Sequence, residues 1–216
     1  MKLLVLGISG RTGKLVAAEA LRRGHKVMGI ARDGSKVDVP GAEITVGSPY
    51  DSETVKKAIE GCDAVVSTLG AFPVSQGLFS KIKSPLDFMS VSIGNVVKQM
   101  EAKGIKRIVV MTALGAGDSS GEIPGFFKFI MKISNIKYAY IDHDKQEMIL
   151  INSKLDWTIV RPVGLNDKDD ELSVIHNLKG VPKIKSGISR NAVAHFILDC
   201  IEKGEFIGQK PGISNA

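Results

Sequence analysis

The peptide Gly-Ile-Ser-Gly-Arg-Thr-Gly-Lys, residues 7–14, has the residue types and the spacing of a loop that binds phosphate groups. It directly follows the apolar run Lys2–Leu6, and it ends in Gly-Lys like a nucleoside triphosphate loop. That loop requires a glycine five positions before Gly13 and a Ser or Thr after the lysine. The sequence has Ile8 and Leu15 at those positions, so the triphosphate loop is excluded.

The three glycines of this peptide have instead the spacing of a turn that binds the diphosphate of a dinucleotide. In that turn a strand ends, the backbone approaches the diphosphate closely, and a helix begins with its amino end facing the negative charge. A glycine-rich turn with a purely structural role is the alternative. Because a strand-like run precedes the turn and a helical pattern follows it, we predict a dinucleotide site that includes Gly7, Ser9, Gly10, Arg11, Thr12 and Gly13.

A basic residue follows the next strand-like run, at the position where NAD-selective domains carry an Asp or Glu for the ribose diol. The residue here is Arg32, and Arg11 lies within the glycine turn. An acidic residue would repel the 2′-phosphate of NADP, whereas a guanidinium can bind it through two parallel hydrogen bonds. We therefore predict NADP(H) in preference to NAD(H). The alternative is that both arginines are solvated surface charges, and Asp33 beside Arg32 leaves it open.

Small or polar residues also follow the other strand-like runs, and the ligand site of such a fold lies at the carboxyl ends of its strands. By position, residues after the third strand would flank the adenine and those after the fourth would contact the diphosphate and ribose. Residues after the fifth and sixth strands would contact the nicotinamide. The predicted contacts are, in chain order, Ser48, Pro49, Thr68, Leu69, Gly70, Thr112, Pro162 and Val163.

These positions require buried parallel strands with helices between them. Near-continuous apolar runs, typical of strands covered on both faces, alternate here with segments of helical period. We predict a doubly wound, parallel-sheet Rossmann fold of the α/β class, with three α/β/α layers. The predicted strands are Lys2–Leu6, Lys26–Ala31, Glu43–Val46, Ala64–Leu69, Arg107–Thr112 and Trp157–Val160, and the predicted helices are Lys14–Arg23, Ser52–Glu60, Leu86–Lys103, Asp144–Asn152 and Arg190–Lys203.

The chain has 216 residues, 44% of them hydrophobic, which is enough for one domain with a full core. We predict a single NAD(P)-binding domain over residues 1–216, with a small substrate-side segment around residues 163–188. Residues 135–143 and 167–187 are less regular. An apolar stretch at residues 126–133, rich in phenylalanine, has helical spacing; we predict that it packs in the core, with a place at the mouth of the ligand site as the alternative.

Composition limits the partners and the compartment. The formal charge of +6 is scattered along the chain without an aromatic-basic cluster, so we expect no nucleic acid partner. No apolar stretch approaches the ~20 residues of a membrane span and no signal peptide is present, so we expect no membrane partner and a cytoplasmic protein. No residue set has metal-ligand spacing, so no metal site is predicted. Cys62 and Cys200 are predicted to be buried free thiols.

Four pieces of the sequence together resemble the atypical short-chain dehydrogenase/reductases. They are the glycine triplet of residues 7–13, the basic Arg32, the stretch Leu155–Pro162, and the stretch Ile188–Phe196 with its His195-Phe pair. Within that family the chain is most similar to the group of NmrA-like proteins and biliverdin reductase B (flavin reductase), from Met1 to about Asn215. The resemblance implies a Rossmann fold, NADP(H), and often reduction of flavins or quinone-like acceptors; some members only sense the dinucleotide.

The resemblance does not extend to a carbonyl-reducing proton relay. Typical short-chain dehydrogenases use a Tyr-x-x-x-Lys pair on a helix, where the lysine holds the ribose and lowers the pKa of the tyrosine for proton donation. Lys145 matches the lysine, but the tyrosine position is Ile141, and Tyr140 points roughly 100° away around a helix. The companion serine is also missing, because Ala113 follows Thr112.

Hydride transfer does not need that relay when the acceptor is a flavin or a conjugated tetrapyrrole, which can take up hydride directly and be protonated by water. The candidate catalytic residues are Thr112, beside the nicotinamide, Lys145, at the ribose, and His143. Either His143 or the Lys145/Glu147 pair would lie beside the acceptor. A solvated position at a helix start is the alternative for His143, and His195 is expected to pack near the core.

We therefore predict an NAD(P)H-dependent oxidoreductase that transfers hydride from NADPH to a flavin, a quinone or a similar planar acceptor. The chain is expected to be a monomer or a homodimer. The alternative is a non-enzymatic NAD(P)-binding redox sensor of the NmrA type, which needs the same glycines and arginines. A sugar-nucleotide epimerase-like enzyme is disfavoured, because such enzymes are longer and depend on the tyrosine that is absent here.

Overall fold

The computed structural model describes residues 1–70, 83–168 and 172–216. Within them, the main sheet is mostly parallel and has the strand order β3-β2-β1-β4-β5-β6-β10-β8. Only β8 runs antiparallel to its neighbour, β10, at the edge of this sheet. The strands are β1 (Lys2–Leu6), β2 (Lys26–Ala31), β3 (Glu43–Val46), β4 (Ala64–Ser67), β5 (Arg107–Met111), β6 (Asp156–Pro162), β8 (Val174–Asn177) and β10 (Gly212–Asn215).

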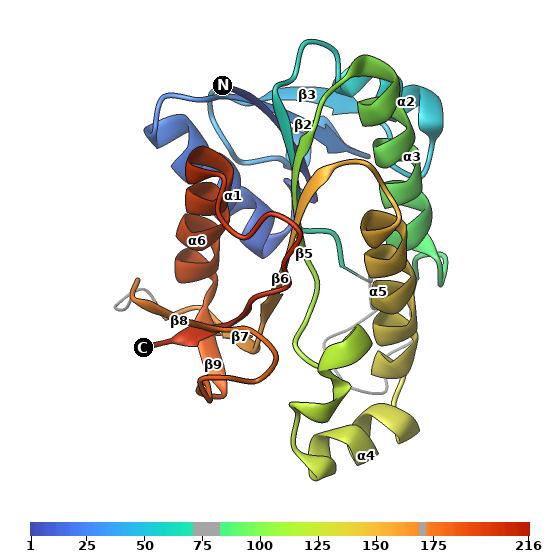
Figure 1. The fold of residues 1–216 in the computed structure, drawn as a ribbon. Coiled ribbons are helices and arrows are strands. Elements are labelled where there is room, and N and C mark those ends of the chain that lie inside the picture. Colours follow the sequence, from blue (N-terminus) through green and yellow to red (C-terminus); the bar gives the residue numbers. More distant parts are fainter. Residues whose placement is uncertain (71–82, 169–171) are drawn as a thin grey trace.

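Helices cover both faces of the sheet, which gives the three layers visible in Figure 1. On one face lie α1 (Arg11–Arg22) and α6 (Arg190–Lys203), and on the other lie α2 (Ser52–Ala58), α3 (Phe88–Lys103) and α5 (Ile136–Ile151). Alternate residues of each strand enter the two cores. In β1, for example, Leu3 and Val5 pack toward α1 and α6, whereas Leu4 packs toward α2 and α3.

The helix boundaries follow from capping groups. The Asp51 carboxylate accepts hydrogen bonds from the backbone N–H groups of Glu53 and Thr54 at the start of α2. At the start of α6, the Ser189 hydroxyl accepts one from Ala192. Gly104 ends α3 in the left-handed conformation, with φ of 72°. These three caps confirm the ends predicted from the sequence for the helices beginning at Ser52 and Arg190 and ending at Lys103.

The predicted fold class is confirmed, and the six predicted strands are present with ends that differ by at most two residues. The sequence missed β8 and β10, which are short and partly polar and extend the sheet beyond β6. It also missed β7 (Gly164–Asn166) and β9 (Gly187–Ser189), a separate parallel pair that joins the two ends of the substrate-side segment. The prediction that residues 135–143 are irregular was wrong, because α5 begins at Ile136.

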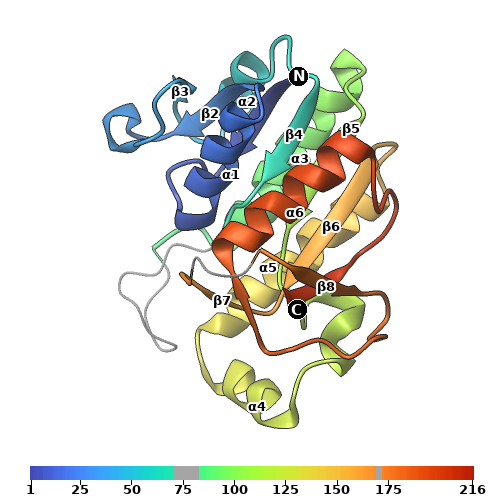
Figure 2. The same ribbon diagram turned by 90° about the vertical axis from the view of Figure 1, so that its left-hand side faces the viewer.

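The prediction that residues 126–133 pack in the core was wrong. They form α4 (Gly125–Ile133), which has no buried residue. Figures 1 and 2 show α4 at one end of the molecule, apart from the layered body. The helical spacing was recognised correctly, but spacing alone does not tell whether a neighbouring element covers the apolar face.

Two further expectations were tested in the described part of the chain. Cys62 and Cys200 are buried free thiols, as predicted, and burial raises the pKa of Cys62 to about 11 and that of Cys200 to about 12. Both thiols are therefore protonated at neutral pH. None of the helices in residues 1–70, 83–168 and 172–216 has the length and apolar character needed to cross a bilayer.

Candidate functional site

The glycine turn joins the end of β1 to the start of α1 against the end of β4. Gly7 has φ of +79°, and a Cβ on it would lie 2.9 Å from Thr68 Oγ1. A Cβ on Gly13 would lie 2.0 Å from the carbonyl oxygen of Gly7, closer than any real contact. The turn is closed by a hydrogen bond of 2.8 Å from the Gly10 N–H to the Gly7 carbonyl. The segments therefore meet so closely that a side chain fits at neither Gly7 nor Gly13. The exposed residues of the turn are Ser9, Gly10 and Arg11.

The amino end of α1 is suited to an anion. Gly10 is the N-cap and supplies no side-chain hydrogen bond, and the first turn contains no acidic residue. The first intrahelical hydrogen bond is donated by the Lys14 N–H to Gly10, so the N–H groups of Arg11, Thr12 and Gly13 have no partner within the helix. These donors and the positive end of the helix dipole fit a diphosphate.

Residues after β4 and β3 are held in place around this turn. Thr68 donates both its N–H and its hydroxyl to the Leu6 carbonyl, at 3.0 and 3.1 Å. Leu69 is buried, whereas Gly70, the last residue described before residue 83, is exposed. After β3, the Pro49 and Tyr50 carbonyls accept hydrogen bonds from Asn95 of α3, and Ser48 Oγ accepts one from Tyr50.

Arg32 is exposed at the carboxyl end of β2, and the neighbouring carboxylate is turned to local partners. Asp33 Oδ1 accepts hydrogen bonds from the Ser35 hydroxyl (2.7 Å) and N–H (3.1 Å), and its Oδ2 lies 3.3 Å from Lys36 Nζ. Hydrogen bonds from Ser35 and Lys36 lower the pKa of Asp33. Asp33 was the residue that argued against an NADP preference, and its carboxylate is the N-cap of a short helix, Gly34–Lys36.

Arg11 extends from the glycine turn to the substrate-side segment. Its Nη1 lies 3.4 Å from Asp167 Oδ2, and Asp167 Oδ1 lies 2.5 Å from Nη1 of Arg190 at the start of α6. Arg11 and Asp167 are both about two-thirds exposed, so their ion pair is weak and can exchange for a phosphate at little cost. The sequence assigned Arg11 to the same phosphate as Arg32, but in this structure its guanidinium pairs with Asp167.

The segments after β5 and β6 lie side by side, as predicted. The Thr112 N–H donates to Val160, the Leu114 N–H donates to Pro162, and the Val163 N–H donates to Ile213 of β10. Thr112, Pro162 and Val163 are therefore brought together at the carboxyl edge of the sheet. This edge also carries Thr68 and the glycine turn, because β4 lies between β1 and β5.

The Thr112 hydroxyl belongs to a buried ionic cluster that sequence reasoning missed. It donates to Glu147 Oε1 at 2.9 Å, and Arg161 holds both oxygens of that carboxylate. The side chains of Arg161 and Glu147 are only 4% and 3% exposed. Gly117 fits against this pair, since a Cβ there would lie 2.6 Å from Glu147 Oε2. Glu147 thus pairs with Arg161, and the expectation that Lys145 and Glu147 lie together beside the acceptor stays a prediction.

Asp118 extends this cluster to the surface. Its carboxylate lies 2.6 Å from Arg161 Nη2 and 2.7 Å from Lys210 Nζ. Burial alone would raise the pKa of Asp118, but the hydrogen bonds from Lys210 and Arg161 lower it to about 2. The cluster links α5, β6 and the segment after β5, and it is a scaffold for the edge rather than an open site.

Lys145 lies on the other side of α5. It is exposed, like Ile141, and lines a shallow groove between α3 and α5 with Ser90, Val91 and Gly94. Lys145 and Glu147 are two positions apart, which corresponds to about 200° around the helix. Because Glu147 faces Thr112, the structure does not bring Lys145 and Thr112 together, and a shared role at the nicotinamide stays a prediction without geometric support.

His143 is buried, so the alternative of a solvated position at a helix start was wrong. Its Nδ1 lies 3.1 Å from Gln146 Oε1, and its ring is edge-on to that of Tyr140. Burial lowers the pKa of His143, which favours the neutral imidazole. Tyr140 donates its hydroxyl to the Leu114 carbonyl, and burial raises its pKa to about 12. Neither residue is poised to donate a proton to a ligand at neutral pH.

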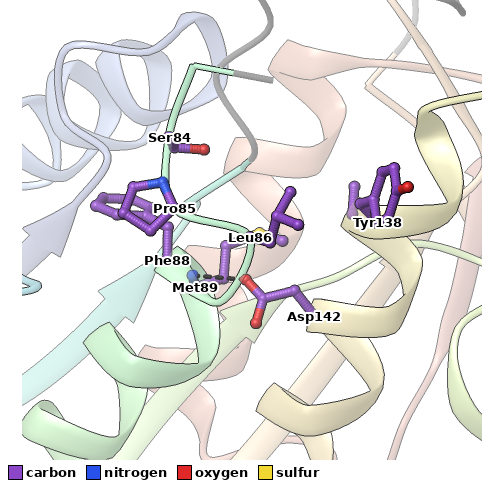
Figure 3. A pocket seen from close by; sticks show the side chains of 8 residues that line it. Ser84, Pro85, Leu86, Phe88, Met89, Tyr138 and Asp142 are labelled. Carbon is purple, nitrogen blue, oxygen red and sulfur yellow. Dashed lines mark hydrogen bonds between the residues drawn. The ribbon is translucent and has the colours of Figure 1, made fainter. Parts of the chain in front are cut away.

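A small cavity between α3 and α5 is equally structural. Figure 3 shows the Asp142 carboxylate directed at the amino end of α3, where it accepts hydrogen bonds from the N–H groups of Met89 (2.7 Å) and Ser90 (3.2 Å). The cavity has a volume of about 10 Å³, enough for one water molecule. Asp142 of α5 therefore caps α3, and the sequence near Ser90 gives no sign of this contact.

His195 lies half-buried between α1 and α6, 3.3 Å from Glu19 Oε1 and 3.2 Å from Arg23 Nη2. It packs beside the core, as expected, within an ionic network with Glu19 and Arg23 in the last turns of α1. Among the residues that the structure describes, no group of three His, Cys, Asp or Glu side chains could hold a metal ion.

Residues 7–204 match the model of a family described as NAD(P)H-binding. The chain is 27% identical to a sanguinarine reductase from Eschscholzia californica, over all of this chain and 92% of that protein. Two solved structures share its fold. A short-chain dehydrogenase/reductase from Veillonella parvula in complex with NADP has a TM-score of 0.77 and 18% identity over 99% of this chain and 94% of that one. ChuY, an anaerobillin reductase from Escherichia coli, has a TM-score of 0.79 and 21% identity over 99% and 97%.

Proposed function

Because the chain belongs to the NAD(P)H-binding family, we propose that it is an NADPH-dependent reductase of a small planar acceptor such as a flavin or a quinone. The family and its reductase relatives support an oxidoreductase. The observation that carries the proposal is the turn in which Gly7, Gly10 and Gly13 bare the amino end of α1 beside Thr68. That cradle excludes side chains and presents backbone N–H groups, as a diphosphate requires.

The preference for NADPH rests on the charges after β2. Arg32 supplies a guanidinium that can bind a 2′-phosphate through parallel hydrogen bonds. The carboxylate of Asp33, which would oppose that phosphate, is instead hydrogen-bonded to Ser35 and paired with Lys36. Because Lys36 offsets the charge of Asp33, the positive charge of Arg32 remains as the net charge of these three residues. The balance at this position favours the additional phosphate of NADPH over the free ribose diol of NADH.

Direct hydride transfer fits the residues at the carboxyl edge. NADPH held at this edge would supply a hydride, that is, two electrons and one proton, and water would supply the proton that completes the reduction of the acceptor. The chain offers no tyrosine relay here, because Ile141 is exposed, Tyr140 is hydrogen-bonded to Leu114, and Ala113 replaces the serine. Its contribution is positioning by the segments that follow β5 and β6, in which Thr112 and Pro162 are buried and hold the backbone in place and Val163 is partly exposed. We leave Lys145 and His143 out of the proposed site.

Turnover tests this proposal against the sensor alternative. The purified chain is mixed with NADPH and, in separate reactions, with FMN, menadione or dichlorophenolindophenol, and the loss of NADPH absorbance is followed against a blank without protein. A reductase should oxidise NADPH with at least one acceptor, faster than with NADH at equal concentration. Saturable NADPH binding without turnover of any acceptor would instead identify a dinucleotide sensor.

A further inference from the structure

Helix α4 presents an apolar face that nothing in the described chain covers. Phe126, Phe129 and Ile133 are 75%, 58% and 53% exposed. Their spacing of three and four residues places them along one side of the helix. Large apolar side chains clustered in this way on the surface mark an interaction site more often than isolated ones do.

The charged residues of α4 itself are both positive. Lys128 and Lys132 are exposed, and their positions lie roughly 60–160° around the helix from the three apolar residues. From Ile123 to Ile141 the sequence contains Lys128, Lys132 and Lys137 but no Asp or Glu. The surface is therefore amphipathic and locally cationic, in a chain whose formal charge is +6.

The shape of the surface is a convex ridge. Figures 1 and 2 place α4 at the end of the molecule in two perpendicular views. Its nine residues span about 13 Å, much less than the ~30 Å hydrocarbon core of a bilayer. A short exposed ridge of this kind can lie in a membrane interface but cannot cross the membrane.

We propose that α4 docks the protein on the surface of a membrane rich in anionic phospholipid. Phe126, Phe129 and Ile133 enter the boundary between headgroups and acyl chains, while Lys128 and Lys132 contact the phosphates. A fluid bilayer accepts a convex ridge without a complementary groove, and anionic lipid matches the run of lysines. The sequence argument against a membrane partner concerned a spanning segment, which interfacial docking does not require.

This proposal does not depend on the proposed reductase activity. If both hold, docking brings the carboxyl edge of the sheet close to the phase in which quinone-like acceptors dissolve. The two fail separately, because vesicle binding is measured without NADPH and NADPH binding is measured without vesicles.

Co-sedimentation of the full chain with vesicles tests the docking. Vesicles of phosphatidylcholine with phosphatidylglycerol should bind the protein at low salt, whereas vesicles of phosphatidylcholine alone should bind it much more weakly. Phe126→Ser and Phe129→Ser leave the charge unchanged and should each weaken binding about tenfold, the effect of withdrawing most of one aromatic side chain from an apolar phase. The double variant Lys128→Glu/Lys132→Glu should also bind more weakly. NADPH titration and thermal unfolding report that each variant is folded.

Two matched controls distinguish docking through α4 from non-specific attraction between a basic protein and anionic vesicles. Val46→Ser removes an apolar side chain that is 68% exposed on β3, and Lys26→Glu/Lys98→Glu makes the same change in net charge away from α4. Both should bind like the wild type. Equal loss in the lysine control, or unchanged binding of Phe126→Ser, would overturn the proposal. A third result would also overturn it: the wild type does not bind vesicles but forms a dimer, and Phe126→Ser dissociates that dimer. Helix α4 would then be a contact between two copies of the chain.

Discussion

At the scale of single residues, the site depends on positions in the turn where only glycine fits. Gly7 and Gly13 lie where a Cβ would collide with backbone or with Thr68, whereas Gly121 would accommodate one freely. The sequence showed the spacing of these glycines but not the distances that require them. It also showed Arg32 and Asp33 but not the contacts of Asp33 with Ser35 and Lys36, because those contacts depend on the short helix at Gly34–Lys36.

Gly13→Ala should abolish measurable NADPH binding. The new methyl group would lie 2.0 Å from the Gly7 carbonyl, so the turn must move and the first N–H groups of α1 lose their arrangement. Destabilisation of about 1–3 kcal/mol should accompany the change. Gly121→Ala is the control, since its Cβ meets nothing within 4 Å. Fluorescence titration with NADPH measures binding, and normal affinity in Gly13→Ala would refute the assigned turn.

Arg32→Asp should reverse the coenzyme preference. Loss of the charged hydrogen bonds should cost roughly 1.5–3 kcal/mol or more of NADPH binding, with NADH little affected. Calorimetric titrations of wild type and variant with both nucleotides measure the difference. Equal losses for NADPH and NADH would remove Arg32 from the 2′-phosphate site.

At the scale of elements, α5 shows how one helix positions its neighbours. One side of it carries Asp142, which caps α3, and Glu147, which binds Arg161 of β6 and Thr112. Sequence analysis found only the second half of this helix. It treated its polar residues as candidates for chemistry, because a buried carboxylate and a catalytic one look alike until the partner element is placed. The strands were predicted more completely, since a continuous apolar run identifies a buried strand by itself.

Glu147→Ala should destabilise the fold by about 3–5 kcal/mol, because it leaves the Arg161 guanidinium buried without its main partner. Asp118→Ala is the matched control. It removes a carboxylate from the same guanidinium, but one whose side chain is 60% exposed, so it should cost no more than about 1 kcal/mol. Urea unfolding gives both values. Similar small losses in the free energy of unfolding for the two variants would show that the Glu147–Arg161 pair does not hold the carboxyl edge of the sheet together.

His143 should make the protein less stable in mild acid. Burial lowers its pKa in the folded state below the ordinary value of 6.5, so the unfolded chain takes up a proton first as the pH falls. The neutral imidazole makes its full contribution to the free energy of unfolding above pH 6.5. Below that pH the contribution decreases, by at most about 1.4 kcal/mol per pH unit. Thermal unfolding at pH 7 and pH 5 should show a smaller drop for His143→Gln than for the wild type. An identical drop would mean that His143 titrates normally.

At the scale of the whole molecule, the order of the strands brings distant segments to one edge. The glycine turn, Thr68, Thr112 and Pro162 come from four strands, and the sequence could place them together because a parallel sheet aligns its carboxyl ends. The same reasoning failed at the periphery. It did not find β8 and β10, whose few residues include polar ones and show no continuous apolar run, and it did not show that α4 projects from the body with Phe126 exposed.

The most direct test of the account is calorimetric titration of the purified chain with NADPH. We predict saturable binding of one NADPH per chain, weaker binding of NADH, and no binding to Gly13→Ala, because all three depend on the exposed amino end of α1 and on Arg32. A flat titration of the folded wild-type chain with both coenzymes would contradict the central claim that this turn holds a dinucleotide.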